Sequence, residues 1–414
     1  MPSSSLRPLD GIRVLDLTVA LAGPYASLLL GGLGAEVIRV ESPNGGDIAR
    51  THPPFVGSNG INFGAKQGDE VSLSVLNRAR NKKSVTLDLK SDQGRDLFMK
   101  LAMKCDIVVE NMSEGATERL GVDYESVSRA NPKIIYASIK AFGEPSPYPA
   151  LKGMDIIVQA LSGLMEVTGF ADGPPTRCGI PISDLVSPLY AVNGILSALI
   201  YRGRTGEGQH ISVSMLDCMA SLIAEEHFDV FGKAGFPVRS GNSQDRHVPF
   251  GAFRSKDGYV AILALTPEWM KGLLDAMGQP QLIDDPRFSS RGPRIKNAAQ
   301  FNAIIEDWTQ RYTSEEVVHE LLEKRNVPAA RVRTPIEMLH DPHLRKSGAI
   351  VDLEHATLGS IGALGMGLPI QFSRSTAKFD QPAMALGAAN EEVYGDLLNL
   401  SLNELEALRA AHVI

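Results

Sequence analysis

The sequence predicts an α/β protein, with a larger domain built on a parallel sheet and a smaller α+β domain after it. Two observations support this prediction. Apolar, strand-like runs alternate with stretches of helical periodicity up to about residue 216, which is typical of βαβ units. Beyond that point the alternation gives way to a hairpin pattern and a series of helical stretches. At 414 residues the chain is also long for a single compact core.

The first βαβ unit can be read from the opening residues. IRVLDL (12–17) is apolar enough for a buried strand, and EVIRVE (36–41) reads as a second strand. Between them, PYASLLLGGLGA (24–35) has helical periodicity, with Pro24 in the first turn. A strand, a helix and a strand within 30 residues predict a parallel pair joined by a right-handed crossover.

The same alternation continues along the chain. Further strands are predicted over 84–89, 105–111, 134–142 and 210–216. Helices are predicted over 93–104, within 124–132, over 153–170 and over 184–203. The smaller domain is expected to contain a hairpin over 256–265, with Asp257 and Gly258 in its turn, and an amphipathic helix is predicted over 392–414.

Composition narrows the possible functions. The net charge of −7 argues against a nucleic-acid partner, so any anion site must be built locally. Cys105, Cys178 and Cys218 form neither a disulfide framework nor a zinc spacing, and the histidines show no metal spacing. No uninterrupted apolar run approaches the ~18 residues of a membrane span. We therefore expect a cytoplasmic protein without a metal site or a membrane partner.

The opening βαβ unit raises the question of dinucleotide binding, since Glu41 ends the second strand where a ribose-binding acid would lie. Such sites need G-x-G-x-x-G directly after the first strand, so that backbone N–H groups can approach the pyrophosphate. Here that turn reads TVALAGP, and GGLG (31–34) lies at the far end of the helix. Those glycines indicate a helix stop and close helix–sheet packing, and NAD binding is disfavoured.

One carboxylate, Asp184, is set among apolar and small residues in CGIPISDLVSPLYA (178–191). In one interpretation, Ser183 or Asp184 caps the following helix by accepting a hydrogen bond from its free N–H groups. In the other, Asp184 is a nucleophile, which needs support from the rest of the chain. This segment alone favours capping.

Basic and amide side chains lie near the predicted strand ends. Each is most simply a solvated surface group, but ligands bind at the carboxyl ends of parallel strands, so together they form a plausible anion site. These side chains are Arg78, Arg80, Asn81, Lys82, Lys83, Asn111, Arg119 and Lys152.

Five blocks of sequence follow one another over essentially the whole chain. They are LDGIRVLDLTVALAGPYASLLLGGLGAEVIRVE, NRARNKKSVTLDLK, CDIVVENMSEGATERLG, SGLMEVTGFADGPPTRCGIPISDLVSPLYAVNGILSALIYRGRTGEGQHISVSMLD and FRSKDGYVAI. In this order they resemble the class III CoA-transferases, a family that includes formyl-CoA and carnitinyl-CoA transferases and also the α-methylacyl-CoA racemases. Such an ordered series is far more specific than any short motif.

The resemblance implies an open, ring-shaped subunit, in which two linkers join a large Rossmann-like domain to a small domain. Two such rings would interlock as a homodimer. On this basis residues 1–200, completed by 390–414, form the large CoA-binding domain, and 226–325 form the small one. Residues 201–225 and 326–389 are the outgoing and return linkers.

The resemblance also implies the chemistry. Asp184 falls on the family's nucleophile, which would carry first an acyl group as an anhydride and then coenzyme A as a thioester. The substrates would be an acyl-CoA and a carboxylic acid, with no tightly bound cofactor, and succinyl-CoA or a similar dicarboxylyl-CoA is the expected donor. Asp184 is therefore assigned as catalytic, although one residue can both cap and react.

Several residues match the family's CoA-binding positions. Asn111, Arg119 and Lys152 match positions near the nucleotide and its phosphates. Leu87 to Lys90 match the adenine-side loop, with Leu87 and Lys90 as the expected contacts, and Ala22 lies in the matching AGP turn.

The match is incomplete at three places. Leu21 replaces a glutamine that lies near the active site in some members, so we expect a more apolar substrate pocket. Ser42 replaces a basic residue that contacts a phosphate. Around Gly241-Asn242, the glycine-rich flap of formyl-CoA transferase has no clear counterpart.

Two alternative functions are a racemase and a catalytically silent CoA-binding protein. The racemases need a second base, a histidine in a G-H-D sequence, but this chain has GMD there, and Met154 cannot move a proton. Asp155, counted among the CoA-site residues, can cap the helix over 156–165 or orient groups near the active site. His247 is expected to be structural or at the rim of a site.

Overall fold

The computed structural model describes residues 6–244 and 246–414, and the chain forms two compact units. The first contains the chain up to Ser162, Gly179–Leu222 and Leu339–Ile414, and the second contains Gly163–Cys178 and Ile223–Met338. These boundaries differ from the expected ones. Residues 163–178 group with the second unit, and residues 339–389, expected in a linker, group with the first.

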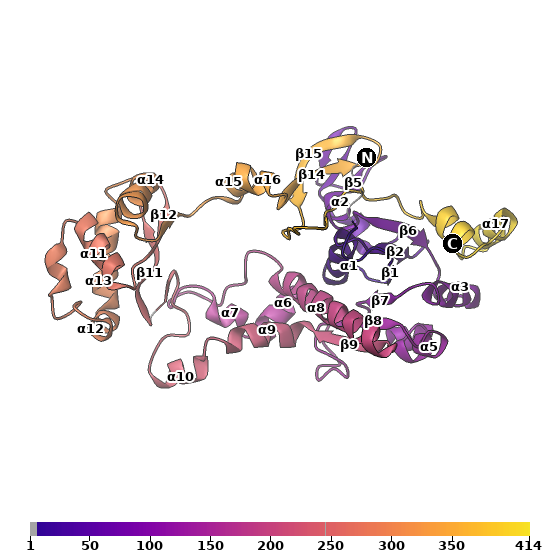
Figure 1. Ribbon diagram of the computed structural model, residues 1–414, viewed down its shortest axis with the longest axis horizontal. Helices are drawn as coiled ribbons and strands as arrows, with labels where there is room; N and C mark the ends of the chain where they lie inside the picture. The colour runs from indigo at the N-terminus through magenta and orange to yellow at the C-terminus, as the bar shows by residue number, and fades with distance from the viewer. Residues whose placement is uncertain (1–5, 245) are drawn as a thin grey trace. The chain divides into compact units, whose positions relative to one another are not determined.

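A six-stranded parallel sheet forms the centre of the first unit, with the order β6-β2-β1-β7-β8-β9 (Figure 1). Its strands are β1 (Arg13–Asp16), β2 (Glu36–Glu41), β6 (Lys82–Thr86), β7 (Ile107–Glu110), β8 (Ile135–Lys140) and β9 (Gln209–Ser214). Leu15 of β1 pairs with Ile38 of β2 and Val108 of β7, and all three side chains are fully buried. The parallel sheet predicted from the βαβ pattern is confirmed.

Helices cover both faces of this sheet, as in doubly wound folds. On one face α1 (Ala22–Gly32) packs against α8 (Ile182–Thr205), and the two are seen side by side in Figure 1. On the other face, one apolar cluster joins the strands to α3 (Asp92–Ala102), α5 (Tyr124–Ala130) and α17 (Leu402–Ala410). The shorter helices of this unit are α2 (Leu73–Arg78), α4 (Ala116–Leu120), α6 (Asp155–Leu161) and α16 (Pro342–Lys346).

The glycines at the end of α1 act as the sequence predicted. The helix ends at Gly32, and Gly34 has a φ of 112°, which is unfavourable for residues with a side chain. A Cβ at Gly32 would lie 2.4 Å from the Phe379 ring. The run GGLG therefore stops the helix and permits close packing.

A hairpin explains why residues 339–389 belong to the first unit. The strands β14 (Ile350–His355) and β15 (Gly359–Met366) pair and pack on α2. Leu353 joins a small core there, and the Arg80 guanidinium donates to the Met366 carbonyl at 2.6 Å. A further antiparallel sheet contains β3 (Phe55–Gly57), β4 (Gly60–Asn62) and β5 (Val71–Ser72).

The second unit is an α+β structure with its own core. Its antiparallel sheet contains β10 (Ser243–Gln244), β11 (His247–Arg254), β12 (Tyr259–Leu263) and β13 (Ala329–Arg331). Its helices are α7 (Leu164–Val167), α10 (Phe228–Lys233), α11 (Pro267–Ala276), α12 (Arg291–Lys296), α13 (Ala298–Thr309), α14 (Ser314–Val318) and α15 (Pro335–Leu339). The predicted hairpin turn is confirmed, because the Ser255 N–H donates to the Gly258 carbonyl. A helix over Met215–Ala224, α9, spans the boundary of the two units.

Two helices predicted as continuous are interrupted. The one over 153–170 breaks at Gly163, whose φ of 86° ends α6 before α7 begins. The one over 392–414 breaks at Asn399 (φ 59°), between a π-helical turn over Glu391–Leu397 and α17. A capping box between Ser401 and Glu404 then starts α17.

Candidate active site

The carboxyl ends of β1 and β7 flank the point where the strand order of the sheet reverses. Open α/β sheets bind ligands in the crevice at such a point. Asn111, directly after β7, bridges the loops that follow these strands. Its side-chain amide accepts a hydrogen bond from the Val19 N–H (2.8 Å) and donates one to the Val19 carbonyl (2.9 Å). The loop after β1 is thereby fixed at its centre.

Charged side chains hold the next residue of this loop, Ala20, in the left-handed region with a φ of 65°. The Asp47 carboxylate accepts from the Ala20 N–H at 3.0 Å, and the Arg78 guanidinium donates to the Ala20 carbonyl at 2.7 Å. A non-glycine residue adopts this conformation only where its surroundings hold it there. Asp47 and Arg78 therefore position the start of α1, which follows two residues later.

Buried ion pairs lie beneath this loop. They are Asp16 with Lys82, Arg39 with Asp47, and Glu41 with Arg50. The Glu41 carboxylate also accepts from the Ser84 hydroxyl, so the acid at the end of β2 is fully engaged and not available to a ribose. Lys82 and Arg80, predicted as members of an anion site, are buried and bonded within the protein, and that prediction is wrong for both.

Asp184 lies in the first turn of α8, and another helix caps that turn. Asp155, the first residue of α6, accepts from the Ser183 N–H (2.9 Å), the Ser183 hydroxyl (2.5 Å) and, more weakly, the Asp184 N–H (3.4 Å). No side chain of α8 caps its own helix, so the capping role expected for Ser183 or Asp184 is wrong. Among the residues that the structure describes, none forms a hydrogen bond or ion pair with the Asp184 carboxylate.

This arrangement changes the acidity of Asp184. Burial raises the pKa of its carboxyl group, and the negative charge of Asp155 raises it further, while the Arg78 guanidinium acts in the opposite direction. The resulting pKa is about 6. Near neutral pH the group is therefore mostly ionised but poorly solvated, a state that favours nucleophilic attack.

By length and composition, α8 is the one helix of the described residues that could cross a membrane. Its packing gives a simpler explanation. The helix buries a face that includes Ala191, Ile195 and Ala198 and contacts α1, β8 and β9. Its apolar character therefore belongs to the packing of the first unit, where it holds Asp184 at the edge of a rigid layer.

The predicted CoA-binding residues occupy several places. Asn111 and Lys152 line one cavity of about 590 Å³ beyond the carboxyl ends of β7 and β8. Ala22 opens α1 directly after the loop held by Asn111. Arg119, in α4, and Lys90, after β6, are exposed and do not line this cavity.

The remaining candidates differ in how available they are. Leu87 is buried at 2% exposure, and its N–H donates to the Glu41 carbonyl. Ser42 forms a local turn, in which its hydroxyl accepts from the Asn44 N–H and its carbonyl accepts from the Gly46 N–H. Met154 is largely exposed beside Asp155, at the position where a racemase would need a base.

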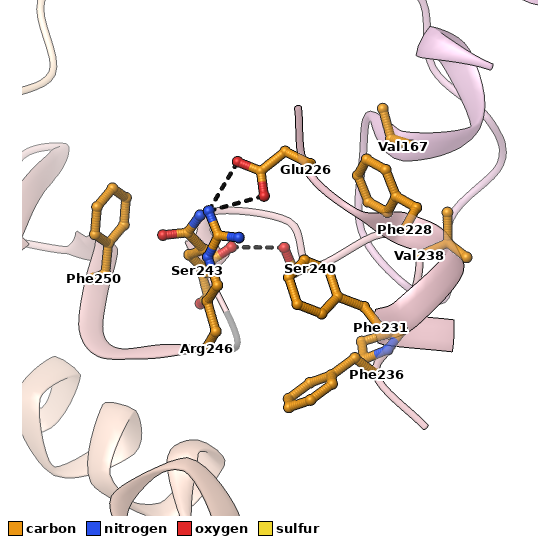
Figure 2. A pocket seen from close by; sticks show the side chains of 12 residues that line it. Val167, Glu226, Phe228, Phe231, Phe236, Val238, Ser240, Ser243, Arg246 and Phe250 are labelled. Carbon is orange, nitrogen blue, oxygen red and sulfur yellow. Dashed lines mark hydrogen bonds and ion pairs between the residues drawn. The ribbon is translucent and has the colours of Figure 1, made fainter. Parts of the chain in front are cut away.

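The region 226–250, which the sequence did not place, lines an aromatic cavity of about 300 Å³ in the second unit. Figure 2 shows the Arg246 guanidinium joined to Glu226, with Phe250 on one side of it and Phe231 on the other. The Arg246–Glu226 ion pair is 3.0 Å long, and the guanidinium lies over the Phe231 ring at 5.3 Å. His247 begins β11 and does not line the cavity.

Sequence reasoning missed the residues that shape the loop after β1. Asp47 and Arg39 follow no periodicity, and Ala20 carries no sign of its left-handed backbone. Arg78 was identified only as a basic residue near a strand. One signal in the sequence could have revealed them. The predicted buried strand 36–41 contains several charged residues, and each buried charge requires a partner of opposite charge nearby.

Comparisons with known proteins identify the family of the chain. A sequence model described as CoA-transferase family III matches residues 9–390. The succinyl-CoA:mesaconate CoA-transferase of Haloarcula hispanica is 38% identical over 352 residues, which is 84% of this chain and 85% of the relative. The succinyl-CoA–D-citramalate CoA-transferase of Chloroflexus aurantiacus is 35% identical over 99% of this chain and 98% of its own.

A solved structure extends the similarity to three dimensions. The crystal structure of a CAIB/BAIF family protein from Brucella suis has a TM-score of 0.81 with this chain at 33% identity, covering 94% of this chain and 99% of the other. Together with the match of the family over most of the sequence, this agrees with the resemblance seen in the sequence blocks. The chain belongs to CoA-transferase family III and is an enzyme of the CoA-transferase class.

Proposed function

We propose that this enzyme moves coenzyme A from an acyl-CoA to a free carboxylic acid through covalent intermediates on Asp184. The observation that carries the proposal is the state of this carboxylate. It is half-buried, it is unengaged by the described residues, and Asp155 fixes the turn that bears it. Transfer without hydrolysis needs a group that holds each fragment in turn, and such a carboxylate is suited to that role.

The reaction proceeds in four steps. The Asp184 carboxylate attacks the thioester carbonyl of the donor, the C–S bond breaks, and an aspartyl–acyl anhydride and the CoA thiolate result. The thiolate attacks the aspartyl carbonyl, which releases the donor acid and leaves an aspartyl-CoA thioester. The acceptor carboxylate attacks the same carbonyl and expels the thiolate, forming a second anhydride. The thiolate then attacks the acceptor's acyl carbon and regenerates the Asp184 carboxylate.

The surroundings must stabilise these intermediates. Each attack forms an oxyanion, and a well-placed backbone N–H donor contributes about 3 kcal/mol to its stabilisation. Water must also be excluded, because the anhydride and the thioester both hydrolyse. The apolar side chain of Leu21, at the start of α1, suits that second requirement.

We propose a dicarboxylyl-CoA such as succinyl-CoA as the donor and a dicarboxylic acid as the acceptor. Two relatives that align with most of this chain are named for succinyl-CoA, with mesaconate or D-citramalate as the partner acid. We also propose that two ring-shaped subunits interlock as a homodimer. The exposed apolar side chains of α8 support a partner, and they are Leu189, Tyr190, Ile200 and Tyr201.

The oligomeric state can be measured directly. Sedimentation equilibrium is expected to give twice the mass of one chain, because exposed apolar surface of this kind is stabilised by burial in an interface. Replacing Tyr201 and Ile200 by serine is expected to weaken the dimer. A chain that sediments as a monomer at every concentration would contradict the homodimer.

Trapping tests the covalent mechanism. The enzyme is incubated with succinyl-CoA, the mixture is treated with hydroxylamine or borohydride, and peptides are analysed by mass spectrometry. The modification is expected on Asp184 alone. A label on another residue contradicts the assignment, and α-proton exchange in deuterated water without transfer would instead indicate a racemase.

The rate of intermediate formation is expected to rise with pH and level off above about 6, because only the carboxylate form of Asp184 attacks and its pKa is about 6. Asp155→Asn keeps an oxygen that can accept from Ser183 but removes the neighbouring negative charge, so the midpoint should move to lower pH. Initial rates between about pH 4 and 8 measure this. Glu207→Gln, beyond the far end of α8, serves as the control, and an unchanged midpoint in Asp155→Asn would contradict the explanation.

A further inference from the structure

The acidic side chains under the loop after β1 each have a bonded cation. Asp16, Asp47 and Glu41 are bonded to Lys82, Arg39 and Arg50 respectively, and all of them lie inside the first unit. These pairs balance one another in charge. They leave the positive charge of Arg78 and the negative charges of Asp184 and Asp155 outside this set of bonded pairs.

Arg78 is held rigidly by neutral groups. Its Nε–H donates to the Ser74 carbonyl (3.1 Å), and Nη1 donates to the Ala20 carbonyl (2.7 Å). Within the described part of the chain Arg78 forms no ion pair with a carboxylate, and Nη2 forms no hydrogen bond. A guanidinium has five N–H donors in a planar fork, so donors remain for a ligand while the charge stays in place.

The helices that carry Arg78 and Asp184 pack against the same neighbour. Arg78 ends α2 and Asp184 opens α8, and α1 packs against both of these helices. The Ala20 carbonyl bonded to Arg78 belongs to the loop that leads into α1. Burial lowers the pKa of Arg78, and the carboxylates of Asp47 and Asp184 oppose that shift, in agreement with this proximity.

We propose that Arg78 binds the carboxylate of the incoming acceptor acid next to Asp184. The inference rests on the proposed covalent mechanism and names the group that recognises the acid substrate. An arginine fork is well suited to a carboxylate, and the two neutral carbonyls that orient Arg78 do not compete for its charge.

The timing of this binding follows from charge. While Asp184 is ionised, its negative charge opposes Arg78 and repels a second carboxylate. When Asp184 carries coenzyme A as a thioester it is neutral, so one of the two carboxylates that oppose the charge of Arg78 is removed. The acceptor acid is therefore attracted at the stage when it is needed, and it is repelled once Asp184 is regenerated.

Arg78→Gln tests this role, because glutamine keeps a donor for the Ala20 carbonyl and lacks the charge. The aspartyl-CoA intermediate is first formed from succinyl-CoA, and its decay is then followed by intact-protein mass spectrometry with either a dicarboxylic acid or neutral hydroxylamine. Decay with the acid is expected to slow by about 10- to 100-fold, as for loss of one partner of a charge pair. Decay with hydroxylamine should stay within about twofold of the wild type.

Two further variants complete the experiment. Arg78→Lys should recover part of the reaction with the acid, and Arg204→Gln, which removes an exposed charge near the far end of α8, should behave as the wild type. Equal slowing with the acid and with hydroxylamine would overturn the proposal, because it would show a distorted loop.

If the wild type forms no intermediate, the covalent mechanism fails. In that case the KM for the acceptor acid is compared between Arg78→Gln and the wild type. An unchanged KM would overturn the proposal that Arg78 binds the acid.

Discussion

Asp184→Asn is expected to lower the rate of CoA transfer by about 10⁴-fold, the loss seen when a covalent nucleophile is removed. The amide has nearly the same shape as the carboxylate, but it cannot form the anhydride. Steady-state assays with succinyl-CoA and a panel of acids measure the loss, and CoA binding is followed by calorimetry. Binding should change little, and turnover within about tenfold of the wild type would contradict the assignment.

The same variant separates chemistry from folding. The pKa of Asp184 is raised by burial, so the folded state holds this proton to higher pH than the unfolded state does. The free energy of unfolding therefore falls as pH rises from about 4 to 6, and it stays lower above that range. Asp184→Asn removes this cost and should raise the stability at pH 7 by about 1–3 kcal/mol. An inactive but more stable protein is the expected combination.

Lys82→Met is expected to destabilise the first unit by about 3–5 kcal/mol, because it leaves the fully buried carboxylate of Asp16 without its cation. Urea unfolding followed by circular dichroism measures the change. Lys83→Met is the matched control on the same strand. Lys83 is partly exposed and pairs at the surface with Glu36, so its loss should cost less than about 1 kcal/mol.

A double variant identifies the cause. In Asp16→Asn combined with Lys82→Met no charge is left uncompensated, so much of the lost stability should return. Thr18 and Ser27 donate to different oxygens of Asp16, so the asparagine oxygen keeps the bond from Thr18, and the amide N–H can donate to the Ser27 hydroxyl, which has lost Lys82 as its donor. A double variant as unstable as the sum of the two single variants would show that packing, and not charge, sets the cost.

The large elements could be predicted because each has a local cause. Apolar runs of strand length set β1 and β2, and Gly32 with Gly34 set the end of α1. The broken helix at Gly163 was missed because glycine is tolerated within helices and only its left-handed backbone, fixed by tertiary contacts, decides the break. Local signals therefore gave the order of the elements but not every boundary.

The site could be predicted only in part. Asp184 was identified through the resemblance, since its own segment favoured capping. Its actual cap, Asp155, lies 29 residues earlier in the chain, and no spacing rule connects the two. Likewise, Asp47 and Arg78 meet at Ala20 through the fold alone. Pairings that arise when distant segments are brought together leave no periodic trace in the sequence.

Asp155 has a consequence for attempts to alter this enzyme. One of its oxygen atoms anchors the backbone of Ser183, and its charge makes the adjacent Asp184 less acidic. Alignment and reactivity therefore depend on one side chain, and only a replacement that keeps an oxygen acceptor, such as asparagine, can change the reactivity without loss of the alignment. Replacements at this position that lack such an oxygen would release the turn that bears the nucleophile, so the optimum pH of this enzyme can be retuned there only within a narrow choice of residues.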